Sequence, residues 1–268
     1  MAEFLEVLSF PFMRRALIVG VIVSLCAALL GVVLVLKRYS LIGHGLGEVG
    51  FAALALAMAL GLPPMPVAIP LVVAASFLIM YLSQRGALAG DAAIGIMAAA
   101  ALSFGVIVTS LSNGFNMDVS DYMFGSILAV SESDVVLSVV LGLAVILMYG
   151  LFFNRLFAIS YDDVNAQATG INVSMYQFMI SLLTAITVVL GMRMMGTMLI
   201  SSLILFPALT ARRLVGSFKA MTLAAAVISV VCFLIGLVLS YALDLPTGAS
   251  VVGVNLAALV GSVAVRRR

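Results

Sequence analysis

Charge is what this sequence has least of. Asp, Glu, Lys and Arg together make up 9% of the 268 residues, whereas hydrophobic residues make up 65% and the mean hydropathy is +1.31. A soluble domain could not bury so much apolar surface, but a lipid bilayer accommodates it. The composition therefore excludes a soluble globular domain. It predicts an all-α polytopic membrane protein, with residues 1–268 forming a single transmembrane domain.

Other scarcities exclude further classes of protein. The net charge is only +2 and the basic residues are scattered, so a nucleic acid is not an expected partner. The two cysteines, Cys26 and Cys232, lie in separate apolar runs and are interpreted as small hydrophobic residues, not as a disulfide framework. No phosphate-binding loop of the form GxxxxGKS or GxxxxGKT occurs. We therefore expect that this chain does not itself hydrolyse ATP and is not an enzyme.

The N-terminal residues do not follow the pattern of a cleaved signal peptide. The first charges, Glu3 and Glu6, are acidic, and no small-residue cleavage site follows an apolar core. We therefore expect the first spanning helix to direct insertion and to be retained. Residues 2–13 ahead of it are predicted to form an interfacial amphipathic segment.

Long apolar runs, by contrast, are abundant, and polar residues, glycine or proline separate them. Because about 20 apolar residues cross the hydrocarbon as a helix, these runs predict nine transmembrane helices. The predicted spans are 16–36, 41–61, 66–83, 92–111, 135–153, 174–192, 195–210, 220–242 and 248–265. Two longer segments, 112–134 and 154–173, are predicted to lie outside the membrane.

The distribution of basic residues predicts the orientation, because Lys and Arg favour the cytoplasmic side of a membrane. With nine spans and the C-terminus inside, ten of the thirteen basic residues fall inside. The inside group is Lys37, Arg38, Arg85, Arg155, Arg212, Arg213, Lys219, Arg266, Arg267 and Arg268, and the outside group is Arg14, Arg15 and Arg193. We therefore predict an outside N-terminus, an outer segment 112–134 and a cytoplasmic segment 154–173.

One acid differs from the other ten Asp and Glu residues, which fall outside the predicted spans or at their ends. Glu48 lies within a span, and His44, the chain's single histidine, precedes it by four residues. A charge inside the bilayer is costly and is by default functional. Spacing of four places both side chains on one helical face, where an imidazole nitrogen and a carboxylate oxygen can converge on one cation such as zinc. Nearby glycines (Gly43, Gly47 and Gly50) would let a neighbouring helix or a substrate approach closely.

Two structural interpretations of this pair remain open from the sequence. The two side chains could simply bond to each other, or His44 could lie close enough to the inner interface to be hydrated. Zinc also usually takes four ligands, so water, another helix or a second subunit would have to complete a site.

The two segments outside the membrane carry further candidates. In the inner segment, Asp162 and Asp163 precede a short Ala-rich stretch that contains Ala166 and ends at Gly170. Acids at its start and glycine at its end predict a brief helix, which could dock a partner protein or be an ordinary capped turn. In the outer segment, Asp118 and Asp121 are candidates for guiding a cation inward, or are solvated loop acids.

Six stretches of the sequence also resemble the permease subunits of the zinc, manganese and iron family of ATP-binding-cassette importers. They occur in the family's order, between about residue 30 and residue 252. They are "GVVLVLKRYSLIGHGLGEVGFAALALA", "GDAAIGIM", "DYMFGSILAVSESD", "SYDDVNAQATGIN", "GTMLISSLILFPALTARRL" and "LSYALDLPTGASVV".

The resemblance implies a homodimeric permease in the bacterial inner (cytoplasmic) membrane. Each half would couple through a cytoplasmic helix to an ATPase subunit and would receive metal from an extracytoplasmic binding protein. By resemblance, residues 161–170 are that coupling helix, with Asp162, Asp163, Ala166 and Gly170 at the matching positions. No cofactor would be bound permanently, because the divalent metal is the transported substrate.

The sequence departs from the family pattern at the intramembrane pair. Where the family commonly has Asp-x-x-x-His, this chain has His44-x-x-x-Glu48, which exchanges the two ligand types but keeps one nitrogen and one oxygen. We expect zinc as the first candidate cargo, with manganese or ferrous iron as alternatives, since all three accept this ligand pair. A proton-coupled secondary transporter is the competing class. A histidine-dependent intramembrane hydrolase is disfavoured, because the chain has one histidine.

Overall fold

A computed structural model describes residues 11–84, 90–112 and 132–265, and every regular element in these ranges is an α-helix. The long helices are α2 (Pro11–Leu36), α3 (Ile42–Ala59), α4 (Pro64–Gln84), α5 (Gly90–Leu111), α7 (Glu132–Leu151), α10 (Val173–Met195), α11 (Thr197–Leu214), α12 (Phe218–Leu243) and α13 (Thr247–Val265). Two short helices, α8 (Phe153–Tyr161) and α9 (Asp163–Ala168), connect α7 to α10.

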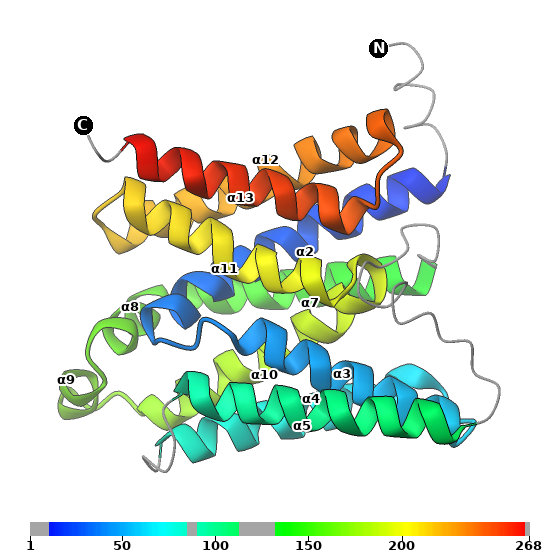
Figure 1. Cartoon of the computed structure of the whole chain (residues 1–268). Helices are drawn as coiled ribbons and strands as arrows, with labels where there is room; N and C mark the ends of the chain where they lie inside the picture. The colour runs from blue at the N-terminus through cyan, green and yellow to red at the C-terminus, as the bar shows by residue number, and fades with distance from the viewer. Residues whose placement is uncertain (1–10, 85–89, 113–131, 266–268) are drawn as a thin grey trace.

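The long helices run along one common direction, so their ends gather at two opposite ends of the bundle (Figure 1). The short helices α8 and α9 and the end of α13 lie at one end, and the start of α2 lies at the other. We call the first the α9 end. It is the end that the distribution of basic residues predicts to be cytoplasmic, and an odd number of spans places the two ends of the chain on opposite sides.

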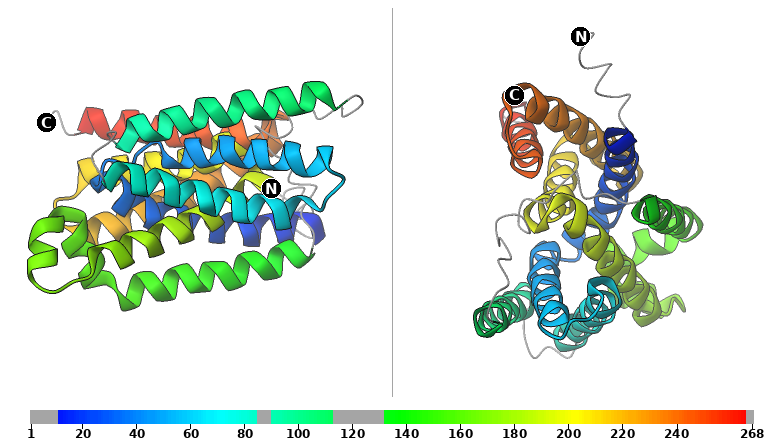
Figure 2. Two further views of the ribbon diagram at one scale, coloured as in Figure 1. Left: turned by 90° about the horizontal axis from the view of Figure 1, so that it is seen from below. Right: turned by 90° about the vertical axis from the view of Figure 1, so that its right-hand side faces the viewer.

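Helices α2 and α11 lie at the centre of the bundle, as the end-on view in Figure 2 shows. Helix α2 packs against α7, α10, α11 and α12, while α3 packs between α11 on one side and the pair α4 and α5 on the other. Large apolar side chains fill these contacts, among them Leu34, Leu46 and Leu203, each at most 1% exposed. The outer helices α5, α7, α12 and α13 expose many large apolar residues, which suits a surface that faces lipid.

The predicted set of membrane spans is confirmed. Among the described residues, eight helices are each long and apolar enough to cross a membrane. A ninth span follows if α7 is counted together with α8, from which it is bent by 74° at a short break. The seventh predicted span was expected to be short, but α11 extends to Leu214 and keeps Pro207 inside the helix, where the residue is buried.

The structure adds detail to two predicted segments outside the spans. Residues 11–13, assigned to an interfacial segment, form the start of α2, and the rest of that segment lies outside the described residues. A proline is tolerated at such a position, because the first turn of a helix leaves its N–H groups unpaired. The inner segment 154–173 contains two helices where one was predicted, since α8 precedes α9.

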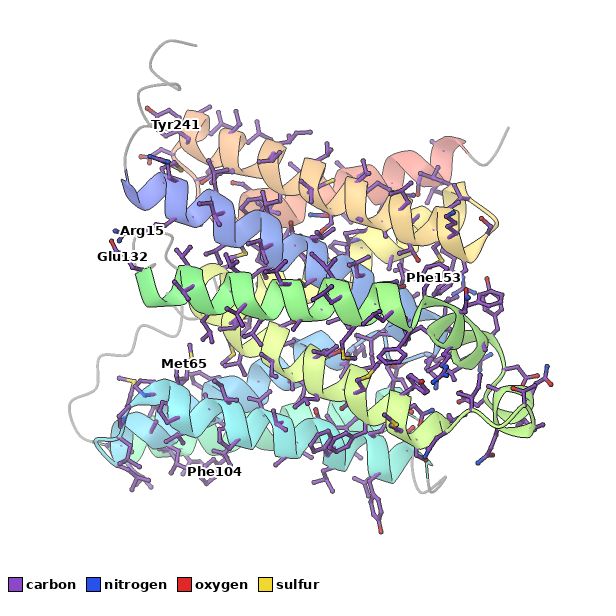
Figure 3. The ribbon with its side chains drawn as sticks, turned by 180° about the vertical axis from the view of Figure 1, so that it is seen from behind. Arg15, Met65, Phe104, Glu132, Phe153 and Tyr241 are labelled. Carbon is purple, nitrogen blue, oxygen red and sulfur yellow. The ribbon has the colours of Figure 1, made fainter. Side chains whose placement is uncertain are left out.

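An ion pair joins two helices at the end opposite α9. Arg15 in the second turn of α2 contacts Glu132 at the start of α7, and both side chains are labelled in Figure 3. This pair neutralises one of the three basic residues that the orientation places outside. It ties the beginning of the first span to the helix that follows the outer segment.

Candidate functional site

The glycines of α3 allow close packing against α11. A Cβ atom added to Gly43 would lie 2.9 Å from Cδ1 of Ile204 and 3.3 Å from Cα of Ser201, and one added to Gly47 would lie 3.2 Å from Cβ of Thr197. The backbones of the two helices therefore approach each other along one face of α3, as small residues permit in membranes. This contact fixes the rotation of α3 about its axis, and with it the direction of the neighbouring His44 and Glu48.

His44 and Glu48 lie side by side on α3, as their spacing predicts. Nδ1 of His44 is 3.7 Å from Oε1 of Glu48, which is too long for a hydrogen bond. The His44 side chain is 59% exposed, whereas that of Glu48 is 11% exposed. His44 belongs to the first turn of α3, near the α9 end, and Glu48 lies one turn deeper. The pair thus connects an open position at the bundle surface to a carboxylate within the bundle.

Further protein ligands for a metal do not gather around this pair in the ranges that the structure covers. Those residues contain no cluster of three or more His, Cys, Asp or Glu side chains able to hold one ion. The two outer candidates, Asp118 and Asp121, lie outside the described residues. A cation at the pair would therefore take its other ligands from water or from a second copy of the chain.

Helix α9 forms because both of its ends are satisfied by the residues that the sequence indicates. Oδ1 of Asp162 accepts hydrogen bonds from the backbone N–H groups of Val164 and Asn165, both at 3.0 Å. At the other end, Gly170 has φ of 85°, and the N–H of Ile171 donates to the carbonyl of Ala166 at 3.1 Å. This is a Schellman motif, which ends the helix at a residue in the left-handed region.

We predict that Gly170→Ala weakens the C-terminal end of α9. A Cβ at Gly170 would meet no atom within 4 Å, so the cost comes from the backbone conformation alone, about 1–2 kcal/mol. Amide hydrogen exchange in the last turn of α9 should become about tenfold faster. Gly216→Ala is the matched control, because Gly216 has equal space and no positive φ. Equal exchange in the two variants would contradict the motif.

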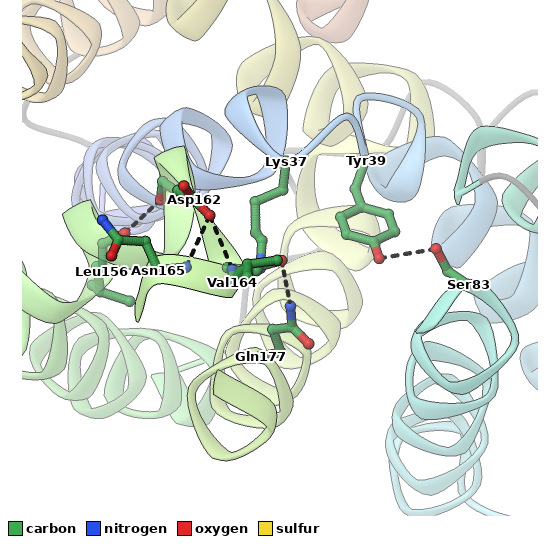
Figure 4. A network of polar contacts seen from close by, with 10 residues as sticks. Lys37, Tyr39, Ser83, Leu156, Asp162, Val164, Asn165 and Gln177 are labelled. Carbon is green, nitrogen blue, oxygen red and sulfur yellow. Dashed lines mark hydrogen bonds and ion pairs between the residues drawn. The ribbon is translucent and has the colours of Figure 1, made fainter. Parts of the chain in front are cut away.

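Asp163 connects α9 to two other parts of the bundle. Its Oδ1 lies 2.9 Å from Nζ of Lys37, and its Oδ2 accepts a hydrogen bond from Nε2 of Gln177 at 3.3 Å (Figure 4). Burial lowers the pKa of Lys37, while the hydrogen bond and the charge of Asp163 act in the opposite direction. Lys37 was interpreted from the sequence only as an orientation signal, and Gln177 was not singled out.

The remaining residues of α9 divide between an inner and an outer side. Ala166 is 4% exposed and packs in the hydrophobic core, so it anchors the helix from within. Val164 is 79% exposed at the end of the bundle. Of the four predicted coupling residues, Asp162 and Gly170 therefore shape the helix, while Asp163 and Ala166 hold it against the bundle. Their role in docking a partner stays a prediction.

Short helix α8 adds an aromatic cluster next to α9. The rings of Phe157 and Tyr161 lie 5.4 Å and 6.4 Å from the ring of Phe218 at the start of α12, and Phe153 lies 5.2 Å from it. Phe157 and Tyr161 are 45% and 58% exposed, so the cluster is open on one side. It fixes the bent α7–α8 junction against α12 and thereby sets where α9 begins.

The fold and these sites define a multi-span helical membrane protein with a capped helix presented at one end. A model of the ABC 3 transport family matches residues 9–266, and the chain belongs to this family. The family resemblance noted in the sequence is thereby confirmed.

Named relatives fall into two groups. The manganese import system permease protein ScaB of Streptococcus gordonii is 31% identical over 251 residues, which are 93% of this chain and 90% of that protein. The high-affinity zinc uptake system membrane protein ZnuB of Haemophilus influenzae is 30% identical over 246 residues, covering 91% of this chain and 93% of that protein. Among solved structures, PsaBC of Streptococcus pneumoniae in complex with a Fab matches with a TM-score of 0.84 and 29% identity, covering 97% of this chain and 94% of that chain.

Proposed function

We propose that this chain is the membrane-spanning permease subunit of an ATP-driven importer of a divalent transition metal in a bacterial cytoplasmic membrane. A separate ATPase subunit would hydrolyse ATP, an extracytoplasmic binding protein would deliver the ion, and two copies of the chain would form the translocation path. Family membership supports the class of transporter, since both manganese and zinc permeases are relatives.

The observation that carries the metal assignment is the geometry of His44 and Glu48. Two ligands of one tetrahedral zinc, each bound at about 2.0–2.2 Å, lie about 3.4 Å apart. The two ligand atoms here are 3.7 Å apart and are not hydrogen-bonded to each other, so a small side-chain movement would let both bind one ion. A pair that existed only for packing would gain more from a direct hydrogen bond, because the carboxylate lies within the bundle.

The position of the pair suits a path that opens alternately to the two sides. Glu48 is enclosed and His44 is open, so an ion could move from the deeper carboxylate past the imidazole toward the α9 end. The exposed side of His44 is also where a second copy of the chain could complete the ligand set.

Zinc and manganese are the two cargoes to be compared. An imidazole suits zinc, iron and other first-row metals, whereas carboxylate and water ligands also suit manganese. One nitrogen and one oxygen thus accept either ion, and the relatives carry both names. Our first candidate remains zinc, with manganese and ferrous iron as alternatives.

The coupling role is tested by ATP hydrolysis. We expect the purified chain in lipid nanodiscs to retain its ATPase subunit, and the metal-loaded binding protein to stimulate hydrolysis. Transport of metal along a proton gradient without ATP, and no retained ATPase, would instead support a secondary transporter and contradict the proposal.

Val164→Asp tests the docking surface on α9. Val164 is the large apolar residue that α9 exposes, and a charge there would disfavour burial in a partner's groove. We expect the affinity for the ATPase to fall about tenfold, which corresponds to a loss of about 1.4 kcal/mol of binding free energy. A charge on an exposed apolar residue of a spanning helix, such as Leu223 of α12, would disturb membrane insertion and is therefore unsuitable as a control. The control is Gln167→Asp, which places the same charge at an exposed and already polar position of α9. Equal loss in both variants would argue against docking through Val164.

A further inference from the structure

We infer that the ion pair between Lys37 and Asp163 is a positioning link, which transmits the displacement of α9 to the helix that carries His44 and Glu48. The inference rests on the proposed function, because it assumes that an ATPase moves α9. It adds a residue pair that determines how tightly ATP hydrolysis is coupled to metal movement. The two residues are 126 positions apart in the sequence and meet at the α9 end.

The pair joins an enclosed lysine to a carboxylate that is 45% exposed. Only 8% of the Lys37 side chain is exposed, and its Nζ lies 2.9 Å from Oδ1 of Asp163. The second carboxylate oxygen of Asp163 is held by Gln177 of α10. An enclosed charge that loses its partner is strongly disfavoured, so Lys37 and Asp163 would tend to move together.

Asp163 also makes the polar side-chain contacts that join α9 to the rest of the bundle. Asp162 caps α9 itself, whereas the carboxylate of Asp163 accepts a hydrogen bond from Lys37 and another from Gln177 of α10 (Figure 4). One of them ends on Lys37, the residue directly after α2. A movement of α9 therefore pulls on the connection between α2 and α3.

That connection is stiff, so it can pass the movement on. Arg38 adopts φ of 63°, in the left-handed region, and the N–H of Tyr39 donates to the carbonyl of Leu34 at 2.9 Å. The hydroxyl of Tyr39 donates to Oγ of Ser83 at 3.0 Å, which ties the same turn to the end of α4. The N–H of Ile42 then donates to the carbonyl of Tyr39 at 3.2 Å as α3 begins.

His44 follows this turn directly, in the first turn of α3. The rigid path thus runs from Asp163 through Lys37 and the Tyr39 turn to His44, without a flexible linker. A displacement of α9 would shift the start of α3 relative to α11. The positions of His44 and Glu48 relative to α11 would change with it. The ATPase and the metal pair would be coupled by a contiguous set of contacts.

Lys37→Met separates this role from docking. The variant keeps the length of the side chain and removes its charge, while Asp162, Val164 and the helix α9 remain. In proteoliposomes with the ATPase subunit and binding protein, we expect retained ATPase and continued ATP hydrolysis, but about tenfold less radioactive zinc or manganese taken up per ATP. Lys219→Met, which changes an exposed lysine at the same end, should leave this ratio unchanged.

The charge-exchanged double variant, Lys37→Glu with Asp163→Lys, distinguishes coupling from simple structural support. We expect it to recover uptake per ATP to within about threefold of wild type, because the ion pair is restored in reverse. Wild-type uptake per ATP in Lys37→Met would overturn the inference. Loss of both hydrolysis and uptake in Lys37→Met, without recovery in the double variant, would also overturn it, since the pair would then only maintain the fold.

A measurement that does not depend on transport keeps the link testable if the proposed function fails. Spin labels at Val164 and Leu41, both exposed, report the distance from α9 to the start of α3 after the buried Cys26 and Cys232 are replaced. We expect a narrow distance distribution in wild type and a broader one in Lys37→Met. Equal distributions would contradict the link, whereas absent ATP-driven uptake by wild type would contradict the proposed function alone.

Discussion

ATP-driven metal uptake is expected to fall by about two orders of magnitude when either His44 or Glu48 is replaced by alanine. Each substitution removes one of only two protein ligands that the described residues place together on α3. The remaining side chain would bind the ion through a single bond, so the bilayer would again oppose its passage. Uptake into proteoliposomes, corrected for the amount of folded complex, measures the effect.

Glu48→Gln separates a ligand role from packing. Glutamine fills the same space but offers a neutral amide, which binds a divalent cation more weakly than a carboxylate. We expect uptake to remain strongly reduced, with thermal stability close to wild type. Asp91→Asn is the matched control, because Asp91 is an exposed acid at the start of α5. Normal uptake in both His44→Ala and Glu48→Gln would reduce the pair to a packing feature.

Gly31→Ala is expected to cause the largest loss of stability among single-methyl additions. A Cβ at Gly31 would lie 2.0 Å from the carbonyl oxygen of Ile204 and 2.9 Å from its carbonyl carbon, so the backbones of α2 and α11 would have to separate. These helices form the centre of the bundle. Overpacking of this kind costs about 3 kcal/mol, and relief by a side-chain rotation is impossible because the obstacle is backbone.

Gly150→Ala provides the comparison for this variant. Gly150 also lies in a long helix, α7, but an added Cβ there would meet no atom within 4 Å. Its stability should be unchanged or slightly higher, because alanine favours a helix over glycine by about 1 kcal/mol. The two variants are compared by the temperature midpoint of their aggregation in detergent, which size-exclusion chromatography detects. Similar midpoints would show that α2 and α11 are not packed backbone to backbone.

Much of the fold could be predicted because the bilayer imposes a simple rule on the sequence. Each apolar run long enough to cross the hydrocarbon became a helix, and the boundary residues differ by a few positions. Helix α8 was missed, although Phe153, Leu156, Phe157 and Ser160 follow helical spacing. With nine residues, α8 is too short to be distinguished by its pattern from the predicted span that precedes it. Its position also depends on aromatic contacts with Phe218, which is distant in sequence.

The candidate site was predictable where local spacing decides it. The four-residue interval placed His44 and Glu48 together, and Asp162 and Gly170 cap α9 as their residue types indicate. The pairing of Lys37 with Asp163 could not be inferred, because these residues are distant in sequence and meet only when the end of α2 and the start of α9 are brought together by the fold. Ala166 was taken as part of a docking set, but whether a small residue faces in or out depends on the same packing.

Uptake of zinc and manganese into proteoliposomes that contain this chain, its ATPase subunit and the binding protein, with and without ATP, tests the central claim most directly. Ferrous iron would be run beside them, and His44→Ala and Glu48→Ala would accompany each metal. We predict ATP-dependent accumulation of one metal and its loss in both variants. Accumulation that is independent of ATP, or equal in wild type and variants, would contradict the account of an ATP-driven importer with its metal pair on α3.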